Sequence, residues 1–400
     1  MLAGRTIVVG LSGGIACYKA CEVVRLLSQA GACVRVVMTA GAQAFVTPLT
    51  LQALSGNPVG TDVFSLTQES EIGHIRLADD ADAIVIAPAS ADVLAKTAGG
   101  IADDLLTTIL LATQAPLLVA PAMNVHMWEH AATQANVKTL RSRGVEIVGP
   151  GVGSLACGYE GAGRMAEPTE VVEAVARLVV PSDLGRERIL VSSGPTREAV
   201  DPVRYLSNRS SGKMGQAVAR IAHRRGAEVT LVSGPTHLPP LVGVRQVDVT
   251  SAEEMAAALK TEFRRATVLV MAAAVADYRP SRVVSRKIKK DDRARTLRLT
   301  RTEDIITGLA RRKGSRIVVG FAAETHDTLT AARRKLTAKR LDLVVANDVT
   351  EPGAGFETDT NIVHLLSTDG LDERLPLLSK DEVADRILDW VIARRRGKRR

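Results

Sequence analysis

The chain begins with Arg5-Thr-Ile-Val-Val-Gly-Leu-Ser-Gly-Gly14, an apolar run that ends in a serine and two glycines. Residues 7–11 have the length and β-branched content of a buried strand, a helical pattern follows over 15–30, and a second strand-like run covers 31–39. Strand, glycine turn, helix and strand in this order form a βαβ unit, which predicts a parallel sheet. The turn can present N–H groups to a phosphate, although it lacks the G-x-G-x-x-G fingerprint of dinucleotide-binding proteins.

The alternation of strands and helices continues through the first half of the chain. Further buried strands are expected at 83–88, 116–121 and 145–148, with helix-length segments between them. Such alternation is typical of a doubly wound sheet covered by helices on both faces. A helix is predicted over 168–179, and we place the end of the first domain at Pro181, which follows it.

The second half of the chain repeats this pattern. A strand at 188–192 leads into Ser193-Gly-Pro-Thr196, and a helix at 215–225 and a strand at 226–233 follow. Further strands are expected at 268–277, 316–321, 343–348 and 361–366, the last of these before a closing helix at 380–394. We therefore predict an α/β protein with two doubly wound Rossmann-like domains. The expected organisation is a first domain at 1–181, a linker at 182–187, a second domain at 188–393 and a disordered basic tail at 394–400.

Composition excludes several classes of protein. The formal net charge is +8, but the tail at 394–400 carries six positive charges, and without it the charge falls to +2. With 3% aromatic residues, the body lacks the basic, stacking surface of a nucleic-acid binder, so no nucleic-acid partner is expected. No apolar run of about 18 residues predicts a membrane span, and no signal peptide is evident. We expect a cytoplasmic protein whose four cysteines are reduced thiols.

One segment, residues 151–165, holds five glycines and Cys157. Glycine tolerates positive φ and allows close approach of backbone to a ligand, so we predict a flap without regular helix or strand that presents the Cys157 thiol. The alternative is a surface loop whose cysteine is incidental.

Other polar residues follow the predicted strands of the first domain, where ligands of such sheets bind. Thr39, Ser90 and Asn124 come at or just after strand ends, and His74 lies on a stretch expected to be irregular. His74, Asn124 and Cys157 would offer a base, an orienting amide and a thiol acid. Taken singly, a polar residue at a strand end is usually a helix cap, and a lone histidine is more often structural.

The second domain has its own candidates. Residues 205–215 are rich in serine, asparagine and glycine before a helix, which indicates a phosphate cradle or, alternatively, a helix N-cap. Asp277 ends an apolar strand. The basic run 286–290 either neutralises a polyphosphate or is a solvated loop. Lys335 and Lys339 lie four residues apart and so on one face of the helix predicted there.

Together these motifs resemble the bifunctional phosphopantothenoylcysteine decarboxylase/phosphopantothenate–cysteine ligase family of coenzyme A biosynthesis, a family of flavoproteins, over nearly the whole chain. The resemblance rests on 12–16, 88–91, 121–128 and 156–165 in the first half, and on 193–198, 207–215, 273–278, 287–290 and 320–325 in the second. It implies a flavoprotein domain followed by a nucleotide-dependent ligase domain.

For the ligase domain, the resemblance implies that CTP, with Mg²⁺, activates the carboxylate of 4′-phosphopantothenate as an acyl-cytidylate, from which L-cysteine displaces CMP. Lys287 would assist formation of the acyl-cytidylate and contact CTP, and Asn208 would act on this intermediate. The remaining CTP contacts would be Ala273, Asp277, Phe321, Lys335 and Lys339. The ligands of the metal are not identified by the motifs.

For the flavoprotein domain, the resemblance implies FMN-dependent decarboxylation to 4′-phosphopantetheine. The cysteinyl thiol of the product would be oxidised toward a thioaldehyde, which allows loss of CO₂, and the electrons would then return to the resulting enethiolate. Cys157 would donate the proton, His74 would be the catalytic histidine, and Asn124 would position the substrate carboxylate. The expected FMN contacts are Ser12, Gly14, Thr39 and Ser90.

The resemblance also implies a homo-oligomer, with trimers of flavoprotein domains and dimers of ligase domains combined in a dodecamer. Two other functions compete with this interpretation. A pyridine-nucleotide oxidoreductase is disfavoured because neither half carries the glycine fingerprint followed by an acidic residue. A DNA-associated protein that uses the basic tail would leave Cys157, His74 and Asn124 unexplained.

Overall fold

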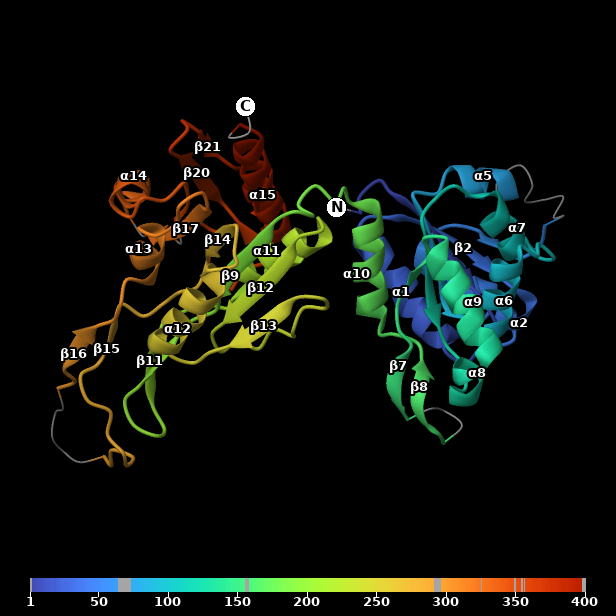
Figure 1. Ribbon diagram of the computed structural model, residues 1–400, viewed down its shortest axis with the longest axis horizontal. Coiled ribbons are helices and arrows are strands. Elements are labelled where there is room, and N and C mark those ends of the chain that lie inside the picture. The colour runs from blue at the N-terminus through green and yellow to red at the C-terminus, as the bar shows by residue number, and fades with distance from the viewer. Residues whose placement is uncertain are drawn as a thin grey trace. The chain divides into compact units, whose positions relative to one another are not determined.

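The computed structural model describes residues 2–63, 73–154, 158–290, 296–324, 326–348, 350–353, 355 and 357–397. The chain divides into two units, Met1–Pro181 and Ser182–Arg400. Figure 1 shows the first unit in blue to green and the second in green to red. Each unit is an open sheet with helices on both faces, which confirms the predicted α/β class.

The sheet of the first unit is parallel throughout and has the order β3-β2-β1-β4-β5-β6. Its strands are β1 (Thr6–Leu11), β2 (Cys33–Met38), β3 (Val59–Gly60), β4 (Ala83–Ala89), β5 (Leu117–Pro121) and β6 (Glu146–Ile147). The chain leaves β3 and returns to the middle of the sheet at β4, so the strand order reverses between β1 and β4. A crevice forms at this point in doubly wound sheets, outside the carboxyl ends of the strands.

Helices cover both faces of this sheet. The core on one face contains Ile7 and Val9 of β1 and is covered by α1 (Cys17–Gln29), α3 (Pro48–Ser55) and α10 (Pro168–Val179). The opposite core contains Val8, because successive side chains of a strand point to opposite faces. It is covered by α5 (His74–Asp79), α6 (Ala91–Gly99), α7 (Leu105–Ala112) and α9 (Ala131–Ser142). Two short helices, α2 (Ala40–Gln43) and α8 (Val125–Glu129), follow β2 and β5.

The sheet of the second unit has the order β13-β12-β9-β14-β17-β18-β20-β21. The strands from β13 to β18 are parallel, and β20 and β21 are antiparallel additions at one edge. Their bounds are β9 (Arg188–Ser193), β12 (Glu228–Ser233), β13 (Arg245–Asp248), β14 (Val268–Met271), β17 (Ile317–Glu324), β18 (Leu343–Asp348), β20 (Val363–Ser367) and β21 (Asp372–Arg374). Two strands, β21 and β22 (Leu378–Ser379), therefore follow the segment expected to be the last strand.

Five helices cover this second sheet. One face packs against α11 (Lys213–Arg224) and α15 (Lys380–Gly397), and the other against α12 (Ala252–Phe263), α13 (Ile305–Ala310) and α14 (Thr328–Ala338). Short antiparallel ladders extend from the units: β7 (Gly151–Ser154) with β8 (Glu160–Arg164), β10 (Arg197–Ala199) with β11 (Tyr205–Ser207), β15 (Tyr278–Pro280) with β16 (Leu299–Arg301), and β19 (Thr360–Asn361) with β22. Within the described ranges no helix combines the length and apolar character needed to cross a bilayer.

The two ends of the second unit differ from the expected linker and tail. Leu184 is buried in the core beside α11, and Asp183 pairs with Arg225 at 2.8 Å, so this segment is part of the second unit. The prediction of a disordered tail from residue 394 is wrong for residues 394–397, which continue α15. Arg394 pairs with Asp369 at 3.2 Å, and Arg395 donates a 2.7 Å hydrogen bond to the Thr267 carbonyl. Arginines also suit the negative, carboxyl-terminal end of a helix dipole. Residues 398–400 lie outside the described part of the chain.

Candidate functional site

A pocket of about 490 Å³ lies at the carboxyl ends of β1, β4 and β5, where the strand order reverses. Its wall is formed by the turn after β1, the start of α6, the segment after β5 and the β7–β8 hairpin. Among the lining residues are Gly13, Gly14, Ser90, Met123, Asn124 and Arg164. The pocket thus combines backbone, hydroxyl and amide groups with the apolar side chains of Ile15 and Met127.

Two of the four predicted FMN contacts line this pocket. Gly14 has no other atom within 4 Å of the position that a Cβ would occupy, which leaves space beside its backbone. Ser90 is the N-cap of α6, and its hydroxyl accepts a 3.3 Å hydrogen bond from the Val93 amide. The start of α6 therefore faces the pocket with its unpaired N–H groups, an arrangement that suits an anion.

The other two predicted FMN contacts, Ser12 and Thr39, are not among the pocket-lining residues. The Ser12 hydroxyl is buried, donates to the Pro88 carbonyl at 2.7 Å and accepts from the Ser90 amide at 2.8 Å. It ties the end of β1 to the start of α6 and so fixes Ser90. Thr39 is the N-cap of α2, where its hydroxyl accepts from the Ala42 amide at 3.3 Å.

The three predicted catalytic residues of the first domain are not brought together within the described part of the chain. Asn124 lines the pocket and is the N-cap of α8, with its Oδ1 accepting from the His126 amide at 2.8 Å. His74 is the first residue of α5, so the expectation of an irregular stretch there was wrong. Figure 1 shows α5 at the opposite end of the first unit from the β7–β8 hairpin. Cys157 lies outside the described residues.

His74 nevertheless has an unusual environment. Its Nδ1 atom is buried and has no hydrogen-bond partner among the residues that the structure describes. A buried ring nitrogen without a partner costs free energy. This nitrogen is therefore a position where a ligand or a second polypeptide could supply a hydrogen bond.

The glycine-rich segment 151–165 is not an irregular flap, because its two ends form the β7–β8 ladder. Gly153 pairs with Gly161, and their φ angles of +149° and +151° are extended conformations that side chains disfavour. A Cβ on Gly161 would lie only 2.8 Å from Val125 Cγ2. Glycine here permits close packing of a strand on α8, and the prediction that it excludes a strand was wrong. The Met123 amide donates to the Gly163 carbonyl at 3.0 Å, which attaches the hairpin to the pocket wall.

A second pocket, of about 420 Å³, lies at the carboxyl ends of β14 and β17 in the second unit. Five of the six predicted CTP contacts line it together, although they come from three separate elements. They are Ala273, Asp277, Phe321, Lys335 and Lys339. The sixth, Lys287, lies on the exposed segment between β15 and β16 and does not line the pocket.

Two lysines bring positive charge to this pocket, whose wall also contains Arg301 and the carboxylates of Asp277, Glu303 and Asp304. Lys335 Nζ donates a 2.5 Å hydrogen bond to the Phe321 carbonyl, and burial together with the nearby Lys339 ammonium lowers the pKa of Lys335. Lys339 pairs with Asp304 at 2.9 Å. Burial would raise the pKa of Asp304, but its contacts with Lys339 and Thr307 outweigh this effect and lower it. The Asp304 carboxyl group is therefore ionised near neutral pH.

The pocket also contains a wall that the sequence analysis missed, formed by residues 301–306. Thr302 Oγ1 donates to the Ala276 carbonyl at 2.6 Å, and Asp304 caps α13 by accepting from the Thr307 amide at 3.1 Å. The available signal was Asp304 three residues before a threonine at the start of an apolar helix, which is an N-cap pattern. That pattern predicts a helix start but gives no indication of a pocket.

The predicted phosphate cradle lies beside the wall of this second pocket. Asn208 Nδ2 donates to the Ala274 and Val275 carbonyls at 3.1 Å each. The N-cap of α11 is Gly212, with φ of +79° and no capping side chain, so the alternative of a serine or asparagine N-cap is not observed. The serine-rich turn thus opens onto a helix start whose amides are not capped by a side chain.

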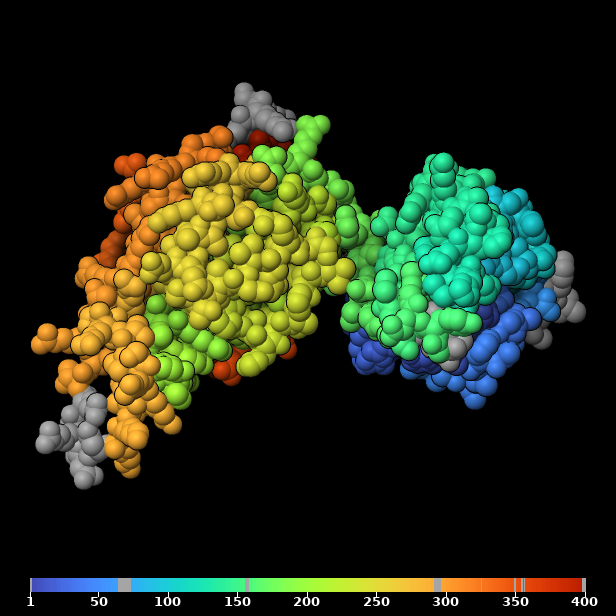
Figure 2. Space-filling view, turned by 60° about the horizontal axis from the view of Figure 1, so that its bottom comes forward, coloured from blue at the N-terminus to red at the C-terminus, as the bar shows by residue number. Residues whose placement is uncertain are grey.

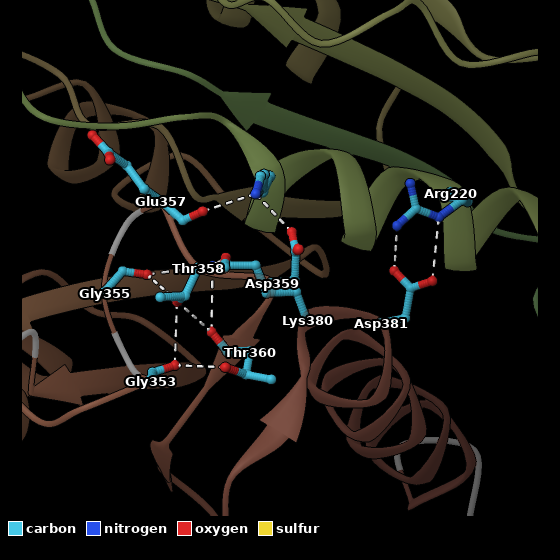
Figure 3. Close-up of polar contacts among 10 residues, drawn as sticks. Arg220, Gly353, Gly355, Glu357, Thr358, Asp359, Thr360, Lys380 and Asp381 are labelled. Carbon is cyan, nitrogen blue, oxygen red and sulfur yellow. Dashed lines mark hydrogen bonds and ion pairs between the residues drawn. The ribbon is translucent and has the colours of Figure 1, made fainter.

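A further polar cluster joins Gly355 and residues 357–360 to the starts of α11 and α15 (Figure 3). Lys213 donates to the Glu357 carbonyl at 2.8 Å and to Asp359 at 2.6 Å. Lys380, which is buried, donates to the Gly355, Thr358 and Thr360 carbonyls. Burial, assisted by the Lys213 charge, lowers the pKa of Lys380 to about 8. Among the described residues, no three acidic, histidine or cysteine side chains are grouped as metal ligands.

Comparison with known proteins agrees with this two-unit organisation. A family model described as Flavoprotein matches residues 1–180, and the model of the DNA/pantothenate metabolism flavoprotein C-terminal domain matches residues 184–394. The coenzyme A biosynthesis bifunctional protein CoaBC of Escherichia coli K12 is 49% identical over 398 residues, and that of Bacillus subtilis 168 is 47% identical over 397, with 98% of each chain covered. A crystal structure of the C-terminal domain of a CoaBC protein is 41% identical, with a TM-score of 0.47, and covers 54% of this chain and 99% of that chain.

These matches span almost the entire length of both this chain and its relatives. They confirm the resemblance drawn from the motifs, and with it the expectation of an enzyme that has decarboxylase and ligase activities. The chain belongs to the family of coenzyme A biosynthesis bifunctional proteins.

Proposed function

We propose that the second unit joins 4′-phosphopantothenate to L-cysteine at the expense of CTP, and that the first unit decarboxylates the product to 4′-phosphopantetheine with FMN. The observation that carries the proposal is the gathering of Ala273, Asp277, Phe321, Lys335 and Lys339 around one pocket. These residues were selected from the sequence as CTP contacts and are separated by up to 66 positions, yet the fold brings them together.

The charges of this pocket suit a nucleoside triphosphate. Lys335 and Lys339 would neutralise phosphate oxygens, which would otherwise repel the incoming carboxylate of 4′-phosphopantothenate. A carboxylate is a poor electrophile for an amine, so transfer of a cytidylyl group to it, with release of pyrophosphate, is needed before cysteine can displace CMP. Asn208, which is hydrogen-bonded to the pocket wall, would contact the resulting acyl-cytidylate. Lys287 would assist its formation.

We expect Mg²⁺ to enter with the triphosphate rather than to occupy a protein cage. The described residues offer no group of three acidic, histidine or cysteine side chains that could hold a metal ion. Of the exposed carboxylates in the pocket wall, Glu303 pairs with Lys260 and Asp304 with Lys339, so Asp277 is the candidate metal ligand. Nucleotide-bound Mg²⁺ commonly uses one or two carboxylates together with phosphate oxygens and water.

The first pocket fits FMN in position and in the character of its lining. It lies at the reversal point of the sheet, with backbone amides at the start of α6 for a phosphate and Ile15 and Met127 as apolar surface for a ring system. FMN, when bound, supplies reversible two-electron redox chemistry, so the decarboxylation needs no external reductant. Asn124 would orient the substrate carboxylate. Cys157, which lies between β7 and β8 in the sequence, would donate a proton to the product. His74 would be the second proton-handling group.

We further propose that the enzyme acts as a cytoplasmic homo-oligomer, with trimers of the first unit and dimers of the second combined in a dodecamer. His74 does not line the pocket of its own chain, and its buried Nδ1 lacks a described partner, which supports completion of the site by a neighbouring copy. Several large apolar side chains of the first unit are also exposed: Ile15, Tyr18, Phe45, Leu49, Ile75 and Leu111. Sedimentation analysis of the FMN-loaded protein tests the assembly.

The experiment that tests the function is product analysis by mass spectrometry. Purified protein receives 4′-phosphopantothenate, L-cysteine, CTP and Mg²⁺, with Cys157→Ser in parallel. We expect 4′-phosphopantetheine from the wild type, and from the variant a species that has lost CO₂ but has not been reduced. Absence of both CMP and ligated product, in a preparation without flavin absorbance, would show that the proposal is wrong.

A further inference from the structure

The segment that carries Lys287 has few attachments to the rest of the second unit. We call residues 281–290 the strap. All of its residues are exposed except Ile288, which is partly buried. Figures 1 and 2 show that the orange segment after β15 projects from the body of the second unit. A segment with so little buried surface depends on individual hydrogen bonds for its position.

Three hydrogen bonds of the strap's backbone to described residues lead to one turn, residues 200–204. The Ile288 amide donates to Asp201 Oδ2 at 3.1 Å, and the Arg204 guanidinium donates to the Ile288 carbonyl. The Val284 amide donates to the Val200 carbonyl at 3.1 Å. Both polar groups of Ile288 are therefore held, and Lys287 is its immediate neighbour in the chain.

The two oxygens of the Asp201 carboxylate have separate partners. Oδ1 accepts from the Val203 and Arg204 amides at 2.8 Å each and so closes the turn. Oδ2 accepts from Ile288 and lies 3.1 Å from the Arg204 guanidinium. The side chain is fully buried, although the strap is exposed. A buried carboxylate with four donors is rigidly held and provides a fixed anchor.

We propose that Asp201 is a positioning residue of the ligase reaction: by anchoring the Ile288 amide, it fixes the place from which the Lys287 side chain reaches the reacting phosphate. This inference rests on the proposed function, in which Lys287 assists formation of the acyl-cytidylate. Asp201 itself does not line the nucleotide pocket and contacts no reacting group.

Asp201→Asn removes the hydrogen bond to the strap and keeps the hydrogen bonds that close the turn. Its Oδ1 can still accept from Val203 and Arg204, but an amide NH₂ in place of Oδ2 cannot accept from Ile288. We expect pyrophosphate release from CTP and 4′-phosphopantothenate, without cysteine, to slow on the order of 10- to 100-fold. Conversion of preformed acyl-cytidylate by cysteine should keep its rate, as should decarboxylation of added phosphopantothenoylcysteine by the first unit.

Limited trypsin digestion supplies a readout that does not depend on activity, because Arg286, Lys287, Lys289 and Lys290 are exposed cleavage sites. In Asp201→Asn, cleavage at these sites should be about tenfold faster than in wild type. Asp342→Asn is the matched control, since Asp342 is also buried, accepts from the Val318 amide at 2.9 Å and pairs with Lys313. It should lower stability without changing cleavage at the strap or pyrophosphate release.

The outcomes distinguish the anchoring of the strap by Asp201 from the proposed role of Lys287 in the ligase reaction. Unchanged cleavage in Asp201→Asn, or equal acceleration in Asp342→Asn, would overturn the anchoring role. Faster cleavage with unchanged pyrophosphate release would overturn the positioning role alone. If Lys287→Ala leaves pyrophosphate release unchanged, the proposed role of Lys287 is wrong and the positioning role is overturned with it.

Discussion

The ammonium of Lys339 lies 2.9 Å from the carboxylate of Asp304, and this pair lines the same pocket as the partly buried Lys335. Asp304 therefore has two tasks, since it also caps α13. The arrangement leaves one lysine neutralised by a carboxylate and another hydrogen-bonded to the Phe321 carbonyl. The two lysines should consequently respond differently to substitution and to pH.

Lys335→Met should raise the KM for CTP about 10- to 100-fold, because it removes a charge-assisted hydrogen bond in a desolvated site. Arg333→Met is the control, as Arg333 lies on the same helix but is exposed and pairs with Asp372. Initial rates of pyrophosphate release at varied CTP concentration give the KM for CTP of each variant. A similar KM in the two variants would contradict the placement of Lys335 at the triphosphate.

Affinity for CTP should fall at alkaline pH as Lys335 loses its proton, and Asp304→Asn should move this fall to lower pH. Burial and Lys339 already lower the pKa of Lys335, while the Asp304 charge raises it, so removal of that charge lowers the pKa further. Lys335 would then lose its proton, and its attraction for phosphate, at lower pH. Asparagine is a good N-cap, so α13 should remain intact. Calorimetric titration with CTP between pH 7 and 10 measures the shift, and displacement to higher pH would refute this assignment.

Asn124→Asp should abolish most decarboxylation while leaving FMN bound. A carboxylate can still accept from the His126 amide and cap α8, so the pocket wall is preserved. Its negative charge, however, would repel the substrate carboxylate, and we expect a loss on the order of 100-fold or more in CO₂ release. Flavin absorbance of the purified variant and CO₂ release are the two measurements. Substantial activity in Asn124→Asp would exclude contact between Asn124 and the substrate carboxylate.

Lys380 should make the stability of the second unit depend on alkaline pH. Its pKa is about 8 in the folded state against an ordinary value of 10.5, so between these values the unfolded chain binds more protons. The free energy of unfolding should therefore rise with pH across this window, by roughly 3 kcal/mol from this residue. Below pH 8 the ammonium is charged in both states, and the full cost of its burial is present.

The corresponding measurement compares denaturant unfolding of wild type and Lys380→Met at pH 7.5, 9 and 10.5. As pH rises, the free energy of unfolding of the wild type should increase relative to that of Lys380→Met. Lys213→Met should narrow the pH range over which stability rises. The Lys213 charge helps to lower the pKa of Lys380 in the folded state, so its removal brings that pKa closer to the ordinary value. A difference that stays constant with pH would show that Lys380 has an ordinary pKa in the folded protein.

Sequence patterns were sufficient to predict the frame of both sheets. Residues 7–11 form β1, and 343–348 form β18 within the expected bounds, because buried parallel strands are continuous apolar runs. The resemblance to a known family named five residues that the fold brings together in the second pocket, and their binding of CTP stays a prediction. Residues 301–306 could not be assigned to that pocket, because they reach the pocket through the contact of Thr302 with Ala276, far away in sequence.

The errors share a physical cause, which is that local composition does not reveal tertiary partners. Glycines at 153 and 161 indicate an irregular loop until Val125 is known to pack against one of them. The Ser12 hydroxyl likewise has partners that the sequence does not reveal, the Pro88 carbonyl and the Ser90 amide, and its contact with FMN stays a prediction. The arginines at 394 and 395 are typical of a disordered end, but Asp369 and the Thr267 carbonyl bind them.

The attachment of residues 183–187 to the second unit determines where the chain can be cut. Arg225 is buried and shared among Asp183, Asp385 and Asp389, and Leu184 fills the adjacent core. A ligase fragment that starts at Ser182 retains the buried Leu184 side chain and all three carboxylates around Arg225. One that starts at Arg188 exposes the apolar surface under Leu184 and removes a counter-ion of a buried guanidinium, so it should express poorly although every strand of its sheet is present.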